Sequence, residues 1–288
     1  MQRIAFPHLG IVLSSVPRGF EVGSLYVALY GVMIALAMGG GIALAMWTAK
    51  RTGQDPEEYL NFSMVAMVLC VLGARAYYVA FSWDYYREHP LQILNLRGGG
   101  LAIYGGVLTG ILVVIVFCRI RRLQTWQFLD TAAAGLALGQ AIGRWGNFFN
   151  REVFGGYTDS LTAMELPLEA VYAGDVTREM REHSRMVDGI EMIRVHPTFL
   201  YESLWNLGVM TLLLLVTFKV SRRLAGDVFC LYLIGYGLGR FWIEGIRTDR
   251  LLIAGTDLAV SQVLSAVLVL IGIGLLLDRH LGAVGRRR

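Results

Sequence analysis

The stretch Ala141–Glu152 reads AIGRWGNFFNRE, and it places Arg144 inside an apolar run. That run, Trp126–Asn150, holds one other charge, Asp130, and is long enough to cross a bilayer, which takes about 20 mostly apolar residues. A charge inside a membrane helix costs at least about 2.5–3.5 kcal/mol and usually faces a cavity or a partner. The apolar run therefore indicates a membrane helix, and Arg144 inside it indicates a candidate functional site.

Six further apolar segments lie on either side of this run and are also predicted to span a membrane. They are Ser24–Trp47, Tyr59–Trp83, Gly98–Cys118, Pro197–Phe218, Val228–Ile246 and Leu258–Leu277. The composition agrees, because 17% of the 288 residues are charged, against about 25% in soluble domains. The three cysteines show no CxxC spacing, which argues against a disulfide framework or a zinc site. We expect an all-α membrane protein of seven transmembrane helices, forming a single domain over residues 1–288.

The loops between these segments predict the orientation. Seven spans place the termini on opposite sides, and the C-terminal side carries 12 Lys and Arg against 11 on the other. Five of those 11 lie in one long connection, Arg151–His196, and long loops count least in the positive-inside rule. We therefore expect a cytoplasmic C-terminus, an N-terminus outside, and a small outward-facing head or lid over residues 151–196. Residues 1–23 lack the apolar core and cleavage site of a signal peptide.

A second arginine, Arg240, lies at a matching depth in the sixth segment. Tyr236, Arg240, Glu244 and Arg247 are spaced i, i+4, i+8 and i+11, which is one helical face. A guanidinium binds phosphate through two parallel hydrogen bonds and stays charged when partly desolvated, so this face favours an anion site. The alternative is that Arg240 and Glu244 form an ion pair that only allows the helix to be buried.

Arg144 has a similar polar setting. Arg144, Asn147 and Arg151 are spaced i, i+3 and i+7, and they share a face if the helix continues that far. Snorkelling towards the interface is the simpler explanation of Arg144 alone. Glu202, inside the fifth segment, needs a partner, and an arginine is expected.

The third segment begins GGGLAIYGGVLTG, residues 98–110. Its glycines serve either close helix packing or the approach of a lipid head group to the backbone. Tyr104 lies among them, as an interfacial aromatic residue or as a hydroxyl directed at a ligand. No nucleotide-binding or hydrolase motif and no metal-ligand spacing is present in the sequence.

These motifs resemble those of the prolipoprotein diacylglyceryl transferases. Residues 143–152, GRWGNFFNRE, are similar to that family's signature G-R-x-G-N-F-x-N-x-E. Supporting matches are Tyr30-Gly31, Gly73-Ala74-Arg75, 99–106 (GGLAIYGG), His196-Pro197-Thr198 with Leu200-Tyr201-Glu202, and 236–247. Phe199 stands where the family often has glutamine.

The resemblance implies transfer of the diacylglyceryl group of phosphatidylglycerol to the lipobox cysteine of an exported prolipoprotein. A thioether forms, glycerol phosphate leaves, and no cofactor or metal is required. The implied setting is the bacterial cytoplasmic (inner) membrane, and we expect a monomer with the lipid bilayer and no nucleic acid among its partners.

The implied catalytic residues are Arg144 and Arg240, which stabilise the leaving phosphate, and Tyr104, which has a positioning role. Some members have a histidine, considered as a general base, where this chain has Tyr104. Since a tyrosine with a pKa near 10 is a poor base, the base stays open. The implied substrate-binding residues are Tyr30, Gly99, Gly100, Asn147, Asn150, Glu152, His196, Glu202, Tyr236, Glu244 and Arg247.

Two other functions use the same residues. A phospholipid transporter or flippase would employ the arginine pair for translocation, and a membrane scaffold would need no such pair. A transporter would favour paired repeats and polar residues near mid-span. The halves of this sequence show no such pairing, and Arg144 and Arg240 lie towards the outer ends of their segments.

Overall fold

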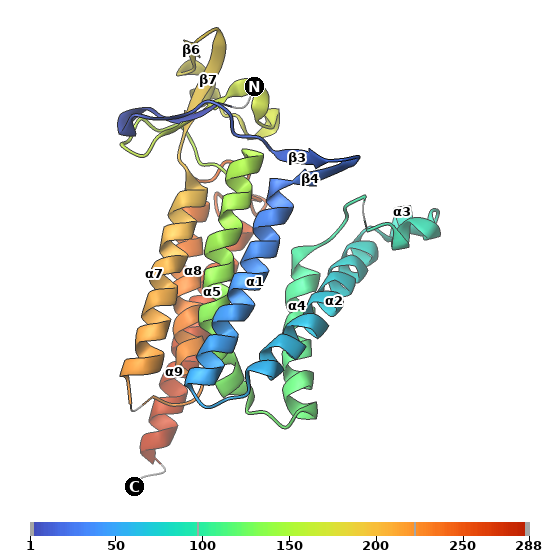
Figure 1. The fold of residues 1–288 in the computed structure, drawn as a ribbon, viewed down its shortest axis with the longest axis vertical. Coiled ribbons are helices and arrows are strands. Elements are labelled where there is room, and N and C mark those ends of the chain that lie inside the picture. The colour runs from blue at the N-terminus through green and yellow to red at the C-terminus, as the bar shows by residue number, and fades with distance from the viewer. Residues whose placement is uncertain (1–2, 97, 222, 286–288) are drawn as a thin grey trace. The chain divides into compact units, whose positions relative to one another are not determined.

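The computed structural model describes residues 3–96, 98–221 and 223–285, which are mostly helical (Figure 1). Its long helices are α1 (Leu29–Arg51), α2 (Pro56–Phe81), α4 (Ile103–Ile120), α5 (Thr125–Asn150), α7 (Thr198–Lys219), α8 (Asp227–Ile246) and α9 (Val260–Gly285). Five of them, α1, α2, α4, α7 and α9, are long and apolar enough to cross a membrane. The chain is therefore a multi-pass membrane protein. The short helices α3 (Trp83–Tyr86) and α6 (Arg178–Glu182) lie in the connections.

The expected all-α class is wrong in one respect, because the chain also contains β-sheet. Strands β1 (Ile4–Phe6), β2 (Ile11–Leu13), β5 (Met164–Pro167), β6 (Arg185–Val187) and β7 (Ile190–Val195) form an antiparallel sheet of order β2-β1-β5-β7-β6. A separate hairpin pairs β3 (Gly19–Val22) with β4 (Leu25–Ala28), so the first helix begins at Leu29 rather than Ser24. Strands of three to six residues are too short to give a clear periodic pattern.

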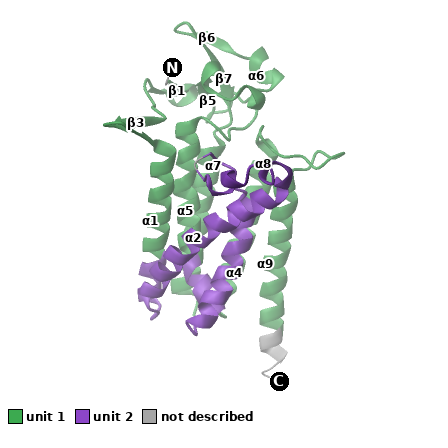
Figure 2. Ribbon diagram, turned by 90° about the vertical axis from the view of Figure 1, so that its right-hand side faces the viewer, with its two compact units in different colours: residues 1–44, 133–288 green, residues 45–132 purple. Residues whose placement is uncertain are grey.

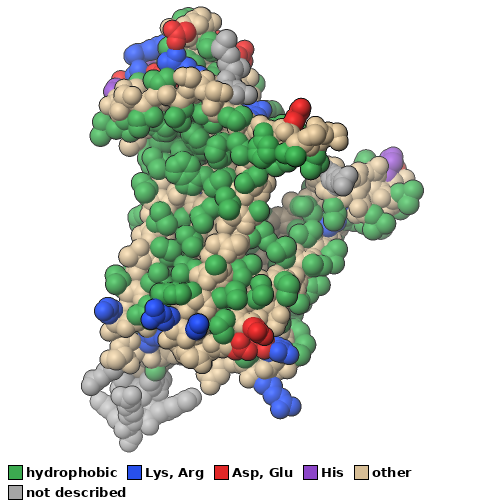
Figure 3. All heavy atoms as spheres, in the orientation of Figure 1, with side chains coloured by type: hydrophobic (Ala, Val, Ile, Leu, Met, Phe, Trp, Pro, Cys, Tyr) green, Lys and Arg blue, Asp and Glu red, His purple; other side chains and the backbone are tan. Residues whose placement is uncertain are grey.

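The connection 151–196 folds together with the N-terminal strands. Ile4, Leu166 and Val195 come from three different strands and are fully buried. They share one apolar cluster with Phe148 of α5 and Phe199 of α7. In Figure 3 charged side chains gather over β6 and β7, whereas hydrophobic side chains dominate the surface of α1 and α7. The sheet is therefore seated on the ends of α5 and α7 by a common core.

The chain divides into two compact units (Figure 2). The first comprises Met1–Leu44 and Ala133–Arg288, and the second comprises Ala45–Ala132. In the first unit α8 packs along both α7 and α9. In the second, α2 packs against α4 so closely that a Cβ at Gly105 would lie 2.5 Å from the carbonyl oxygen of Gly73.

Candidate functional site

Glu202 on α7 lies at the centre of an ion-pair network that joins three helices. Its Oε1 accepts a hydrogen bond from Arg240 Nη1 of α8 at 2.7 Å, and its Oε2 pairs with Arg144 Nε of α5. Glu202 is only 4% exposed. A buried carboxylate needs cationic or hydrogen-bonding partners, and two guanidiniums supply them here. The predicted pairing of Glu202 with an arginine is confirmed, and it involves two arginines.

The network continues along α8 and past its end. Arg240 Nη2 lies 2.6 Å from Glu244 Oε2, and the same oxygen lies 3.4 Å from Arg247 Nη1. Arg247 also donates to both carboxylate oxygens of Asp249, at 2.9 and 2.7 Å. Burial raises the pKa of Asp249, but the hydrogen bonds from Arg247 outweigh it and leave that pKa below its ordinary value. Three arginines thus alternate with three carboxylates, and their formal charges balance.

Arg144 pairs with one carboxylate of this network, whereas Arg240 and Arg247 each pair with two. The Arg144 side chain is 23% exposed, against 16% for Arg240 and 9% for Arg247. Its Nη1 and Nη2 make no hydrogen bond or ion pair to the described residues 3–96, 98–221 and 223–285. Glu202 holds the Nε edge, so the Nη pair is oriented and can bind two oxygens of one phosphate at once.

The signature segment ends in a sharp reversal of the chain. α5 ends at Asn150, and Arg151 and Val153 then adopt φ of +56° and +60°, a backbone conformation that residues other than glycine rarely take. Arg151 is 4% exposed and donates through Nη2 to the carbonyl oxygen of Val16, which anchors the turn on the N-terminal region. Arg151 would share a helical face with Arg144 only if the helix continued that far, and it ends one residue earlier, at Asn150.

The reversal turns Glu152 back onto the helix. Its Oε1 accepts a hydrogen bond from Asn147 Nδ2 at 2.9 Å, and its backbone N–H donates to the carbonyl of Asn147. Asn147 is 8% exposed, and Asn150 is partly buried at the end of α5. The ring of Tyr30 lies over Gly146, where an added Cβ would come within 2.9 Å of Tyr30 Cδ2. The structure therefore brings Tyr30, Asn147 and Glu152 together at the signature segment.

Two glycines bring the ends of α5 and α8 together. Gly155 N–H donates to the carbonyl of His196, and His196 N–H donates to the carbonyl of Gly156. Gly156 N–H in turn donates to the carbonyl of Ile246 at 2.9 Å, next to Arg247. A Cβ at Gly155 would lie 2.8 Å from the Ile246 oxygen, so only glycine permits this approach. The backbone position of Arg247 is fixed in this way.

The two remaining predicted binding residues of this unit, His196 and Tyr236, make aromatic or hydroxyl contacts. His196 Nδ1 lies 3.2 Å from the hydroxyl of Tyr201, which lies 2.7 Å from Thr162 Oγ1. Burial lowers the pKa of His196, so its imidazole is neutral at pH 7. Tyr236, one turn before Arg240, stacks on Tyr232 with ring centroids 5.9 Å apart.

The third predicted catalytic residue, Tyr104, belongs to the second unit together with Gly99 and Gly100. Tyr104 is 40% exposed in the first turn of α4. Gly99 and Gly100 have φ of +84° and +74°, so the chain is not helical where the third span was predicted to begin at Gly98. The predicted catalytic role of Tyr104 and the predicted substrate-binding role of Gly99 and Gly100 stay predictions.

Comparison with known proteins tests the family resemblance. A family model described as prolipoprotein diacylglyceryl transferase matches residues 17–277. The chain belongs to this family. A relative from Thermosynechococcus vestitus, named phosphatidylglycerol–prolipoprotein diacylglyceryl transferase, is 40% identical over 252 residues, 88% of each chain. Relatives of the same name from Bacillus cytotoxicus and Streptococcus agalactiae are 37% and 38% identical, and cover 94% and 92% of this chain and 96% of their own.

The family resemblance noted in the sequence is therefore confirmed, and the flippase and scaffold alternatives are not favoured. The candidate site also includes one residue, Asp249, that the sequence analysis did not single out. Asp249 completes the ion-pair network, and its place two residues after Arg247 was the available signal. Phe199, which replaces the family's frequent glutamine, packs its ring on Trp145 and Phe148 with centroids 5.3 and 4.9 Å apart.

Proposed function

We propose that this chain transfers the diacylglyceryl group of phosphatidylglycerol to the lipobox cysteine of a prolipoprotein. The observation that carries the proposal is the buried Arg144–Glu202–Arg240 bridge, with the Nη groups of Arg144 unpartnered among the described residues. The names of the relatives supply both substrates. The chemistry requires an anion site next to a lipid-accessible surface, and this bridge joins helices of a multi-pass membrane protein.

The reaction forms one carbon–sulfur bond and breaks one carbon–oxygen bond. The cysteine thiolate attacks the glycerol carbon that bears the phosphate ester, and the electron pair of the broken bond leaves with glycerol phosphate. Arg144 and Arg240 bind the phosphate oxygens and stabilise the charge that builds up on the leaving group. The nucleophile belongs to the substrate, so the chain itself needs none. Asn147 and Glu152 hydrogen-bond the head group, and we assign Tyr104 a polar, positioning role.

The sheet supports seven spans and an outward-facing site. β1 precedes α1, and it pairs with β5 beyond α5, with Ala5 opposite Glu165. Strands of one sheet lie on one side of the membrane, so the chain between them crosses an even number of times. Because α1, α2 and α4 each have the length and apolarity of a span, α5 supplies the fourth crossing. α7, α8 and α9 then lead to a C-terminus on the opposite side.

Orientation and setting complete the proposal. The charge bias of the loops places the C-terminus in the cytoplasm. Residues 151–196 and the sheet then form an extracytoplasmic head, as an exported substrate requires. We propose the bacterial cytoplasmic membrane as the location and a monomer as the working unit.

The test is transfer by the purified protein in nanodiscs. Phosphatidylglycerol and a lipobox peptide are supplied, and glycerol phosphate release is measured together with the mass gain of the peptide. We expect cysteine-dependent transfer that Arg144→Ala and Arg240→Ala both abolish while the proteins still fold. Arg178→Ala is the matched control, because the Arg178 side chain is 92% exposed and should not affect the rate. Wild-type turnover in either site variant would refute the assignment.

A further inference from the structure

Arg75 of α2 is a buried charge outside the arginine network. It is 6% exposed, and its guanidinium donates to five backbone carbonyls of the connection between α2 and α4, from Gln92 to Gly100. Nε donates to Ile93 at 2.9 Å, Nη1 to Gly99 and Gly100 at 2.8 and 2.9 Å, and Nη2 to Gln92 and Asn95 at 2.5 and 3.1 Å. A guanidinium has five N–H donors. The Arg75 side chain thus ties five carbonyl groups of this loop to α2.

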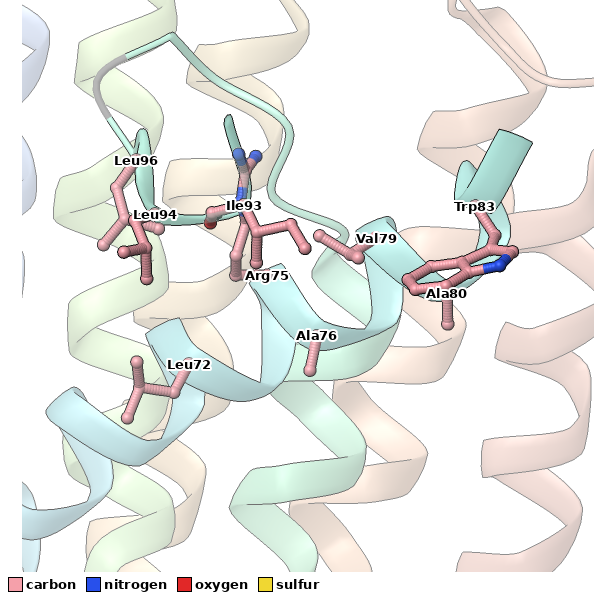
Figure 4. Close-up of a pocket in the computed structure, with 9 residues that line it drawn as sticks. All are labelled: Leu72, Arg75, Ala76, Val79, Ala80, Trp83, Ile93, Leu94 and Leu96. Atoms are coloured by element: carbon pink, nitrogen blue, oxygen red, sulfur yellow. Dashed lines mark hydrogen bonds between the residues drawn. The ribbon is translucent and has the colours of Figure 1, made fainter. Parts of the chain in front are cut away.

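The surroundings of Arg75 explain why the loop needs hydrogen-bond donors from a side chain. Its guanidinium carbon lies 5.1 Å from the ring centroid of Tyr86, and an apolar hollow of about 470 Å³ lies beside it. Figure 4 shows Arg75 of α2 next to Ile93, with Leu94 and Leu96 also lining the hollow. Carbonyl groups in apolar surroundings must be satisfied by protein donors. Arg75 supplies those donors.

The loop leads directly into the segment that carries Tyr104. After Gly100 the chain is tied again to the same stretch of α2, because Ala102 N–H donates to the carbonyl of Ala74 at 3.1 Å. In the first turn of α4, Gly105 lies against Gly73 and Ala74. The segment from Gly99 to Tyr104 is therefore held on both sides by three consecutive residues, of which Arg75 alone acts through its side chain.

We propose that Arg75 is a positioning residue of the transferase, and that it sets the conformation of Gly99–Tyr104 by holding the carbonyl groups of the preceding loop. The inference rests on the proposed function for its consequence on the reaction, but the hold on the loop is independent of that function. Gly100 fits the same arrangement, since a Cβ there would lie 2.4 Å from Arg75 Nη1.

The test compares Arg75→Lys with Arg87→Lys in full-length protein in nanodiscs. Lysine keeps the charge but carries its three donors on one atom, so it cannot reach carbonyls spread around a planar fork. We expect amide hydrogen exchange in residues 92–104 to accelerate at least about tenfold, with exchange in α9 unchanged. We also expect kcat for transfer to fall at least about tenfold. Arg87 has a side chain that is 57% exposed, so its lysine variant should match the wild type.

Gly100→Ala and Gly99→Ala form a second pair of variants, in which Arg75 itself is not substituted. Both put a side chain at positive φ, but the Cβ of Gly100 would lie 2.4 Å from Arg75 Nη1 and 2.8 Å from Tyr78 Cε1, whereas that of Gly99 has no neighbour within 4 Å. We expect the larger acceleration of exchange and the larger loss of kcat for Gly100→Ala. Unchanged loop exchange, or an unchanged kcat, in Arg75→Lys would overturn the proposal. If the wild type itself transfers nothing, the proposed function fails, and the exchange data still decide whether Arg75 holds the loop.

Discussion

Replacing Glu202 by glutamine removes one charge from the centre of the network and keeps the shape of the side chain. The carboxylate accepts from Arg240 Nη1, at 2.7 Å from Oε1, and pairs with Arg144 Nε through Oε2. The amide has only one oxygen, so it cannot satisfy both arginines in this way. Arg240 retains Glu244, but Arg144 loses the ion pair that orients it. The formal charge of the six-residue network rises from zero to +1.

The magnitude follows from the burial of each partner. Breaking a buried ion pair by removing one member costs about 3–5 kcal/mol. Arg144 is 23% exposed and Arg240 keeps one carboxylate, so we expect the lower end, about 3 kcal/mol of unfolding free energy. Misplacing a group that binds the reacting phosphate lowers the rate about 100-fold. Glu202→Asp keeps the charge on a shorter side chain and should lose only about tenfold.

The assay is glycerol phosphate release at saturating phosphatidylglycerol, with thermal unfolding followed by tryptophan fluorescence. Glu58→Gln is the control, because Glu58 pairs with Arg121, which is 50% exposed and belongs to the other unit. That variant should transfer at the wild-type rate. Transfer by Glu202→Gln within about threefold of the wild type would refute the view that Glu202 orients the arginines.

Two further predictions concern residues next to the network. Burial lowers the pKa of folded His196, so the unfolded chain takes up the proton first. The stability from this residue is complete above its unfolded pKa of about 6.5 and is lost as the pH falls through the folded value. His196→Asn should flatten the fall in unfolding temperature from pH 7 to 5, and an unchanged slope would contradict this. Gly146→Ala should push the ring of Tyr30, 2.9 Å from the new Cβ, and raise the KM for phosphatidylglycerol about threefold to tenfold. Gly39→Ala on the same helix as Tyr30 meets nothing within 4 Å and should leave KM unchanged, whereas equal KM values in all three proteins would exclude the effect.

The helices could be predicted from the sequence because each needs only local information. An apolar run of about 20 residues is enough to identify a membrane helix. The predicted bounds differ at the N-terminal ends of the first and third spans, where short strands or glycines at positive φ precede the helix, and at the C-terminal end of the seventh, where α9 continues to Gly285. The sheet could not be predicted, since the pairing of Ala5 with Glu165 depends on the whole fold.

The contacts of the site likewise divide into those set by local spacing and those set by the packing of helices. Arg240 and Glu244 are one turn apart, so their contact follows from helical spacing. The bridge from Glu202 to two other helices depends on how α5, α7 and α8 pack, and the sequence indicated only that a partner was needed. Arg151 was misplaced because nothing in GNFFNRE marks the end of the helix at Asn150.

The position of β1 between β2 and β5 in the sheet sets an order for biogenesis. Ile4–Phe6 leaves the ribosome first, yet its neighbour β5 begins at Met164, after four long helices have been synthesised. During insertion the edge of β1 that later pairs with β5 stays unpaired. The sheet is complete only after β5, β6 and β7 have reached the same side of the membrane. An affinity tag or reporter fused ahead of Ile4 would sit beside this late assembly step, whereas one placed after α9 would leave it undisturbed.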